Sequence, residues 1–326
     1  MKKIVSLLLV LAMLTALPLL IACGGVDTEL PIRVWTLNGT TGFGMAQLID
    51  ADKNGSSELN YEFTVETNAA NVQSALINGD ADIAALPTNA ASVLYNKTKG
   101  EIVLLALNTR GVLYLVANTG KVAAPTSLAD LAGKTVYVPA QNPTFITKAL
   151  IEKASVANVT LDNTTYAEPA ALRDALASGL VDYAVLPEPM VTIAKTKAAQ
   201  SNVSLSDPLN LTAEWDKHFT EGSLVQGCIV ARKAFVEEHP NEVEAFLEAY
   251  EASINFAIEN PADTATMIAA AGIFAQAPVA QKALPKCNLC FITGEEMKTA
   301  METFLAAMPV NSVGGALPAA DFYYGA

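Results

Sequence analysis

The stretch "ALINGDADIAALPTNA", residues 75–90, returns one hundred residues later as "ALASGLVDYAVLPEPM", residues 175–190. A glycine placed before an Asp and a short apolar run suits the left-handed residue that ends a helix. The apolar run itself is typical of a short buried strand. We therefore interpret the shared Gly and Asp as scaffold and the residues after each proline as the candidate functional part. From Leu76 onward, six offsets are identical in the two copies: Leu76, Gly79, Asp82, Ala84, Leu86, Pro87 and Leu176, Gly179, Asp182, Ala184, Leu186, Pro187.

The sequence around each copy predicts the same alternation of strands and helices. Apolar runs at 32–37, 61–65, 82–86 and 101–107 read as strands separated by helices of about ten residues. The pattern restarts at 135–140, and "VWTLNGTTGFGMAQLI" (34–49) aligns with "VYVPAQNPTFITKALI" (136–151). Such βα units indicate a parallel sheet covered on both faces. We predict an α/β protein of two similar domains.

A third section, from about 232 to 307, has helical periodicity and would pack on one of the two sheets. Thr293 followed by Glu296 resembles a capping box at one of its helices. The strand within 223–235 would return the chain to the first domain. The predicted division is 1–23 as a leader, 24–110 plus 233–326 as domain one, and 111–232 as domain two.

Composition narrows the function. The length of 326 residues fits two domains. The net charge of −13 argues against a nucleic-acid partner, which would require a basic surface. Two histidines and four cysteines leave few ingredients for a metal site or a histidine-based triad. We expect no cofactor and no metal.

The N-terminus resembles a secretory leader. Lys2 and Lys3 precede an apolar run from Ile4 to Ala22, which then meets "LIACGG". A transmembrane anchor is the alternative, because the run is almost long enough to span a bilayer. "LIAC" resembles a bacterial lipobox, in which Cys23 would carry the acyl chains that hold the protein at a membrane. We expect a lipid-anchored extracytoplasmic protein.

Three cysteines follow Cys23. A disulfide from Cys228 to either Cys287 or Cys290 is plausible outside the cytoplasm, and the choice between them stays open. "CNLC" (287–290) also has the spacing of a redox or zinc half-site, but no second pair accompanies it.

Four polar turns follow the predicted strands at "NGTTG" (38–42), "PTN" (87–89), "QNPT" (141–144) and "PEP" (187–189). In open α/β sheets, ligands bind at this end of the strands. The alternative is that these polar residues cap the helices that follow. The recurrence of such turns in both halves favours a binding site. The candidate ligand-binding residues are Asn38, Gly39, Thr40, Thr41, Gly42, Pro87, Thr88, Asn89, Arg110, Gln141, Asn142, Thr144 and Glu188.

The lipobox, the duplicated unit, "SLADLAGKTVYVP" and "ARKAFVEEHP" together resemble the periplasmic-binding-protein family of type II topology. The most similar subgroup serves nitrate, taurine, alkanesulfonate and thiamine-precursor importers. The resemblance covers nearly the whole mature chain. It implies two α/β domains joined by two crossover strands, one solute held in the cleft between them, and the permease and ATPase subunits of an ABC importer as partners. It also implies ligand contacts in the turn at Asn38 to Gly42, at Pro87 to Asn89, and in the matching turns of domain two.

The sequence therefore predicts a monomeric solute-binding lipoprotein that delivers a small polar molecule to an ABC permease. A ligand-sensing receptor domain is the alternative. An extracytoplasmic enzyme is a third reading, but Glu188 is the only carboxylate in a candidate turn and has no evident partner. Superfamily enzymes that make the thiamine pyrimidine need a histidine in the site, whereas His218 and His239 lie outside the turns. Arg110 could meet an anionic group or flank the hinge.

Overall fold

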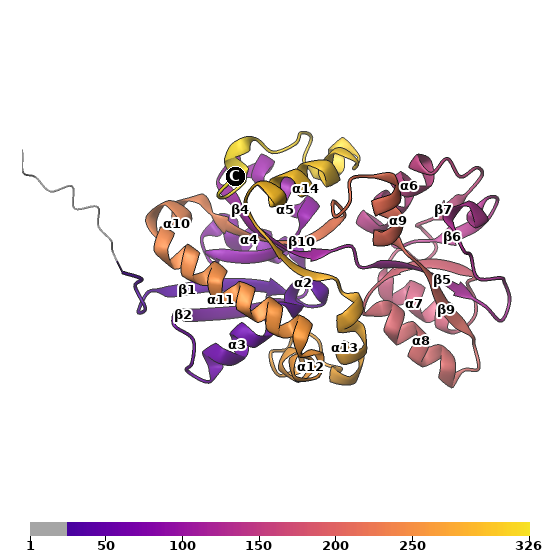
Figure 1. Cartoon of the computed structure of the whole chain (residues 1–326), viewed down its shortest axis with the longest axis horizontal. Coiled ribbons are helices and arrows are strands. Elements are labelled where there is room, and N and C mark those ends of the chain that lie inside the picture. The colour runs from indigo at the N-terminus through magenta and orange to yellow at the C-terminus, as the bar shows by residue number, and fades with distance from the viewer. Residues whose placement is uncertain (1–24) are drawn as a thin grey trace, which may run out of the picture.

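The chain folds into two α/β domains, each built on its own sheet (Figure 1). This computed structural model describes residues 25–326, so the predicted leader and Cys23 lie outside the described residues. The first domain has a six-stranded sheet of order β11-β4-β10-β3-β1-β2, and the second has a five-stranded sheet of order β7-β6-β8-β5-β9. The predicted α/β architecture of two domains is confirmed.

The first domain contains the repeat's first copy, the helices before and after it, and the C-terminal section. Its strands are β1 (Pro31–Leu37), β2 (Asn60–Glu66), β3 (Ile83–Pro87), β4 (Ile102–Arg110), β10 (Val225–Arg232) and β11 (Leu289–Ile292). Its α-helices are α2 (Thr40–Phe43), α3 (Ala46–Lys53), α4 (Ala69–Asn78), α5 (Thr88–Thr98), α10 (Lys233–Glu238), α11 (Pro240–Glu259), α12 (Pro261–Ala270), α13 (Ala277–Ala283) and α14 (Gly294–Ala306). Short 3₁₀ turns complete it: η2 (Leu284–Lys286), η3 (Val310–Val313) and η4 (Ala320–Phe322).

The second domain is smaller and repeats the plan. Its strands are β5 (Leu113–Asn118), β6 (Thr135–Tyr137), β7 (Thr160–Asp162), β8 (Tyr183–Pro187) and β9 (Leu205–Asn210). Its helices are α6 (Asn142–Lys153), α7 (Pro169–Ala177), α8 (Met190–Gln200) and α9 (Leu211–His218), with the 3₁₀ turn η1 (Leu128–Leu131).

The central strands are apolar on both faces because helices cover both faces of each sheet. In β3, Ile83 and Ala85 face one core cluster while Ala84 and Leu86 face the other, and all four are fully buried. In β8, Tyr183 and Val185 share the cluster of Ala84 and Leu86, whereas Ala184 faces a third cluster. One core cluster therefore runs continuously from the first domain into the second.

The prediction of parallel sheets needs a correction. β1, β2 and β3 run parallel, as do β6, β7 and β8. β10 runs antiparallel to β3, and β5 runs antiparallel to β8. The reason is the connectivity: a strand that arrives from the other domain starts at the edge of the sheet where the βα strands end.

Two crossovers join the domains, one from β4 to β5 at residues 110–113 and one from α9 to β10 at about 219–225. The residue-level division into domains stays a prediction. It assigns β10 to domain two, whereas β10 pairs with β3 and β4 of the first sheet.

Two local expectations are wrong. Thr293 lies at the N-cap of α14, but its side chain makes no capping hydrogen bond in the described structure, so no capping box forms with Glu296. Cys228, Cys287 and Cys290 are free cysteines. The sheet order explains why Cys228 and Cys290 do not meet, since β4 lies between β10 and β11.

Candidate functional site

The strand register brings both proline turns of the repeat to the junction between the domains. Pro87, at the end of β3, pairs with Gly227 near the start of β10. Pro187, at the end of β8, pairs with Leu113 at the start of β5. Because β5 and β10 are the first strands after the crossovers, each turn lies beside a crossover.

Each proline turn is hydrogen-bonded to one crossover. The Thr88 hydroxyl donates to the carbonyl of Val225 over 2.8 Å. The Glu188 amide donates to the carbonyl of Val112 over 2.9 Å. The Val112 amide in turn donates to Gln226 Oε1 over 2.8 Å, which joins the two crossovers. Equivalent turns in the two copies of the repeat are thus hydrogen-bonded to the two crossovers that join the domains.

Two candidate residues from different domains touch directly. Asn142 Nδ2, at the start of α6, donates to Asn89 Oδ1, in the first turn of α5, over 2.7 Å. Asn142 Oδ1 is buried and finds no hydrogen-bond partner among residues 25–326. A buried amide oxygen without a partner is costly and is a natural place for a water molecule or a ligand donor.

The turn at 38–42 lies at the end of β1 in the first domain. Gly39 has φ +85°, and its amide donates to the carbonyl of Ile273 over 3.2 Å. Gly42 is buried, and a Cβ there would lie 2.1 Å from the carbonyl oxygen of Leu37. The carbonyl of Thr41 accepts a hydrogen bond from Asn108 Nδ2 over 3.0 Å. The close packing at Gly42 sets the path of this turn against β1, while Asn38 is exposed.

The alternative that the polar turn residues are ordinary helix caps is wrong for α5 and α6. Pro87 and Gln141 occupy the N-cap positions, and neither side chain caps its helix in the structure of residues 25–326. Thr144 instead donates to the carbonyl of Pro139 over 2.7 Å. By contrast, Asn68 caps α4 and Asn210 caps α9 through their side chains. The first-turn amides of α5 and α6 therefore lack the capping oxygen that α4 and α9 have.

Glu188 plays a different part at the start of α8. Its side chain is 2% exposed, and its two carboxylate oxygens accept hydrogen bonds from the amide and the hydroxyl of Thr192, each over 3.1 Å. Burial raises the pKa of this carboxyl, and the hydrogen bonds from Thr192 and the positive charge of Lys286 offset this only in part. In the second copy of the repeat, a carboxylate thus occupies the helix start that stays uncapped in the first copy.

Arg110 is not brought together with the turns. Its guanidinium lies 3.6 Å from a carboxylate oxygen of Glu296 on α14. It lines a cavity of about 310 Å³ with the loop at 220–223 and the start of α14. Its assignment as a ligand contact stays a prediction that these neighbours do not favour.

The Gly and Asp of the repeat lie away from the junction. Gly79 and Gly179 have φ +80° and +73°, in agreement with their predicted role at helix ends. Asp82, 2% exposed, accepts hydrogen bonds from Arg33 Nη2 over 2.7 Å and from Arg232 Nη2 over 2.5 Å. Burial on its own would raise the pKa of Asp82, but the hydrogen bonds from both arginines lower it below its ordinary value.

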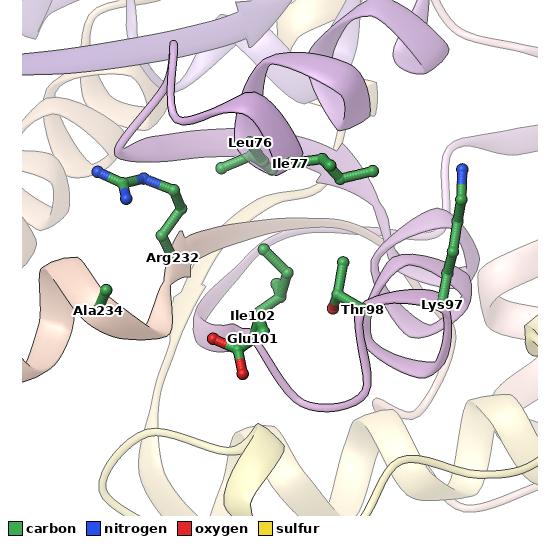
Figure 2. A pocket seen from close by; sticks show the side chains of 8 residues that line it. All are labelled: Leu76, Ile77, Lys97, Thr98, Glu101, Ile102, Arg232 and Ala234. Carbon is green, nitrogen blue, oxygen red and sulfur yellow. The ribbon is translucent and has the colours of Figure 1, made fainter.

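Figure 2 shows a cavity of about 410 Å³ at this far end of the first domain. Apolar side chains of Leu76, Ile77 and Ile102 line it, with Arg232 and Lys97 at its sides. Ile102 begins β4 and Arg232 ends β10, so this cavity lies at the strand ends opposite the junction. It contains none of the candidate ligand-binding residues.

Several polar residues at the junction escaped sequence reasoning. Asn108, 1% exposed within the apolar strand β4, donates to Thr41 and to the hydroxyl of Tyr250. Lys286 forms an ion pair with Asp207 of the second domain, which Lys195 also contacts. The sequence does contain a signal for Asn108, because it is a polar residue that directly follows an apolar run within one strand. No local pattern distinguishes Lys286 or Asp207 from other charged surface residues.

Two further findings concern the described residues. Within 25–326, no group of three or more His, Cys, Asp or Glu side chains could hold a metal ion. No helix of that part of the chain is long and apolar enough to cross a membrane.

These features define the class of the molecule. Two α/β domains joined by two crossovers, with strand-end turns facing the junction, make up the type II periplasmic-binding-protein fold. The family model described as NMT1/THI5 like matches residues 56–264, more than half of the chain. The chain belongs to this family.

Solved structures share this fold. A crystal structure of an ABC transporter from Parabacteroides distasonis has 26% sequence identity and a TM-score of 0.76, with 91% of this chain and 99% of that chain covered. The periplasmic aliphatic sulphonate binding protein SsuA from Escherichia coli has 13% identity and a TM-score of 0.65, with 88% and 92% covered. A putative sulfonate-binding SsuA from Methylobacillus flagellatus has 14% identity and a TM-score of 0.65, with 89% and 88% covered. A comparison with curated protein sequences finds no match.

Proposed function

We propose that the chain is the solute-binding component of an ABC importer and that it holds one small polar solute between its two domains. The observation that carries the proposal is the meeting of two candidate turns, one from each domain. Asn89 of the first domain and Asn142 of the second lie 2.7 Å apart at the starts of two helices. A solute that binds both domains favours the closed arrangement through its higher affinity for that state. The family and the similar transporter structure support this role.

The helix starts suggest the chemistry of the solute. Amides at an uncapped helix N-terminus favour a hydrogen-bond acceptor or a negative charge, and α5 and α6 both lack a side-chain cap. Glu188 is already hydrogen-bonded by Thr192 and is desolvated. We infer a neutral or singly charged solute with at least one acceptor group. The similar protein SsuA from Escherichia coli is an aliphatic sulphonate binding protein, and sulphonates are compatible with this inference.

The proposed contact set consists of twelve residues from the four turns. These are Asn38, Gly39, Thr40, Thr41, Gly42, Pro87, Thr88, Asn89, Gln141, Asn142, Thr144 and Glu188. We treat Arg110 as a hinge-flanking residue, because it contacts Glu296 and the loop at 220–223. The role is binding without chemistry: the one carboxylate of the turns has the contacts of a helix-capping group.

The proposed location of the protein rests on the sequence of its predicted leader. We propose that Cys23 is lipidated and that the anchored protein works at the membrane surface beside its permease and ATPase. Cys23→Ala should leave the chain unlipidated, as judged by the mass of its N-terminal peptide. An unmodified Cys23 in the mature wild-type chain would refute the anchor and leave the binding role untouched.

The binding role is tested by native mass spectrometry of the chain purified from its expression host. We expect a co-purified small molecule, and Asn142→Ala should weaken its binding about tenfold, since a buried hydrogen-bonding amide is removed. Asn71→Ala is the matched control, because Asn71 lies on α4 and contacts Glu66 in the same domain. A chain that binds no small molecule in a solute panel, or equal loss in both variants, would contradict the proposal.

A further inference from the structure

Besides the two covalent crossovers, a third segment connects the domains. It consists of residues 284–288, Leu284 to Asn288, between α13 and β11, and we call it the interdomain strap. Figure 1 shows α13 and the chain after it at the boundary with the second domain, and α13 packs against α8 there.

The strap is rooted in the first domain. Leu284 and Cys287 are 5% and 0% exposed and belong to the same core cluster as β1 and α11. The strap begins as a 3₁₀ turn, in which residues three apart share a face. Leu284 and Cys287 therefore fix one face inside the first domain, and Lys286 and Asn288 are left to contact other parts of the molecule.

The other face of the strap contacts the second domain. The Lys286 ammonium forms an ion pair with Asp207 on β9, where the two side chains are 37% and 13% exposed. The hydroxyl of Tyr114, on β5, donates to the carbonyl of Lys286 over 2.9 Å. The same ammonium lies 5.5 Å from the centre of the Tyr114 ring. These are three contacts across the domain boundary at one residue.

The strap also contacts the first crossover. The Arg110 amide donates to the carbonyl of Asn288 over 2.9 Å. Asn288 Nδ2 donates to the carbonyl of Gly111 over 2.5 Å. The strap is therefore hydrogen-bonded to the residues about which the domains would rotate, and it reaches from there to Asp207.

Asp207 has two lysine partners, one from each domain. Lys195 on α8 contacts one carboxylate oxygen and Lys286 contacts the other. Burial alone would raise the pKa of Asp207, but hydrogen bonds from the two lysines lower it. When the domains separate, Asp207 keeps Lys195 as a partner, so opening leaves no unpaired half-buried carboxylate. The Lys286–Asp207 ion pair can therefore break and form again at a small cost in free energy.

We propose that the strap is a latch that sets the balance between the open and closed domain arrangements through the Lys286–Asp207 pair. The latch acts without solute. It rests on the proposed function in one respect, because closure matters where a solute binds between the domains. A solute would add its own contacts to an equilibrium that the latch has already shifted.

The test measures the distance between the domains in the full chain without solute. Spin labels carried by non-natural amino acids at Asp263 on α12 and Ala171 on α7, both exposed, report that distance by double electron–electron resonance. Lys286→Met should lower the ratio of closed to open molecules about fivefold, as expected for a partly exposed ion pair. Tyr114→Phe should lower the ratio less, and 1 M NaCl should lower it in the wild type but not in Lys286→Met.

Lys195→Met is the matched control, because it removes a lysine from the same carboxylate but leaves the interdomain pair in place. The ratio should not fall in this variant. A wild-type chain without a short-distance population, an unchanged ratio in Lys286→Met, or an equal fall in Lys195→Met would overturn the latch. Because no solute is present, these results are independent of whether the proposed binding role is correct.

Discussion

The two copies of the repeat share their backbone features but differ in which carboxylate is buried. Both have a left-handed glycine, a buried strand and a proline turn beside a crossover. In the first copy, Asp82 is buried between Arg33 and Arg232, and the following helix starts uncapped at Thr88. In the second copy, Asp182 is exposed, and the buried acid is Glu188 at the start of α8.

The difference shows that backbone geometry and side-chain chemistry are separable in a duplicated unit. Glycine, apolar alternation and proline set the path of the chain and recur at fixed offsets. The carboxylates, in contrast, serve whichever partners the surrounding elements supply. In the first domain these partners are two arginines at the far end of the sheet, and in the second they are the Thr192 amide and hydroxyl at the junction.

The largest expected effect separates the two aspartates. Asp82→Asn should lower the free energy of unfolding by about 3 kcal/mol, near the low end for breaking a buried pair because both arginines are partly exposed. Asp182→Asn should change it by less than about 0.5 kcal/mol. Urea unfolding measures both variants. Equal effects in the two copies would mean that burial of Asp82 is not what distinguishes them.

The contribution of Asp82 to the free energy of unfolding should also depend on pH. Its pKa is lowered in the folded chain, so its contribution is fully present above the unfolded pKa of about 3.9 and is lost as the pH falls through the folded pKa. The stability gap between wild type and Asp82→Asn should therefore close on strong acidification. A gap that is constant from pH 6 to the lowest pH at which the chain still folds would contradict the ion-pair explanation.

The two glycines of the repeat, in contrast to its two aspartates, should lose similar amounts of stability when they are substituted. Gly79→Ala and Gly179→Ala should each cost about 1–2 kcal/mol, because an L side chain is strained at positive φ. The added methyl group has space in both places: the nearest atom would be 4.0 Å away at Gly79 and 3.4 Å away at Gly179. Thermal unfolding checks this pair, and a large cost at one glycine alone would show that the copies do not share a scaffold.

Thr88→Val tests the attachment of the first turn to its crossover. The variant loses the hydrogen bond to the carbonyl of Val225 and should cost about 1 kcal/mol. It should also weaken solute binding if the turn is held in place by this bond. Thr98→Val is a control, since the Thr98 hydroxyl donates only within its own helix, to the Leu94 and Tyr95 carbonyls. Similar affinities in both variants would show that the attachment does not position the turn.

The smallest expected effect is that of Glu188→Gln, which should raise the free energy of unfolding rather than lower it. Burial raises the pKa of Glu188 in the folded chain, so wild-type stability should fall as the pH rises from the unfolded pKa, about 4.3, through the raised folded pKa. Glu188→Gln should lack this fall and gain less than about 1 kcal/mol at pH 7, since Gln keeps an oxygen for Thr192. A loss of stability at pH 7 would mean that the charged form is favoured by a partner of Glu188.

The sequence predicts the scaffold well because its signals are local. Glycine at a helix end, an apolar run and a proline are each decided by neighbouring residues, and they place Gly79, β3 and Pro87 correctly. The antiparallel course of β5 and β10 depends on the connectivity of the whole chain, so local patterns miss it. The missing caps on α5 and α6 have the same explanation, since Thr88 and Thr144 bond to carbonyls outside their own helices.

The residues between the domains are the hardest to predict. Lys286 and Asp207 are 79 positions apart in sequence and meet only because two separately built domains lie against each other. Asn89 and Asn142 were predicted as members of two candidate turns, but their direct contact could not be read from either turn alone. Sequence periodicity describes each domain, and it contains no information about the surface between them.

A crystal structure of the chain with its co-purified solute is the sharpest test of a binding site shared by the two domains. We expect density between the domains, in contact with the turns of the first domain at 38–42 or 87–89 and with Asn142 or Glu188 of the second. A solute that contacts only one domain, or that lies in the cavity of Figure 2 beside Ile77 and Arg232, would contradict a shared site.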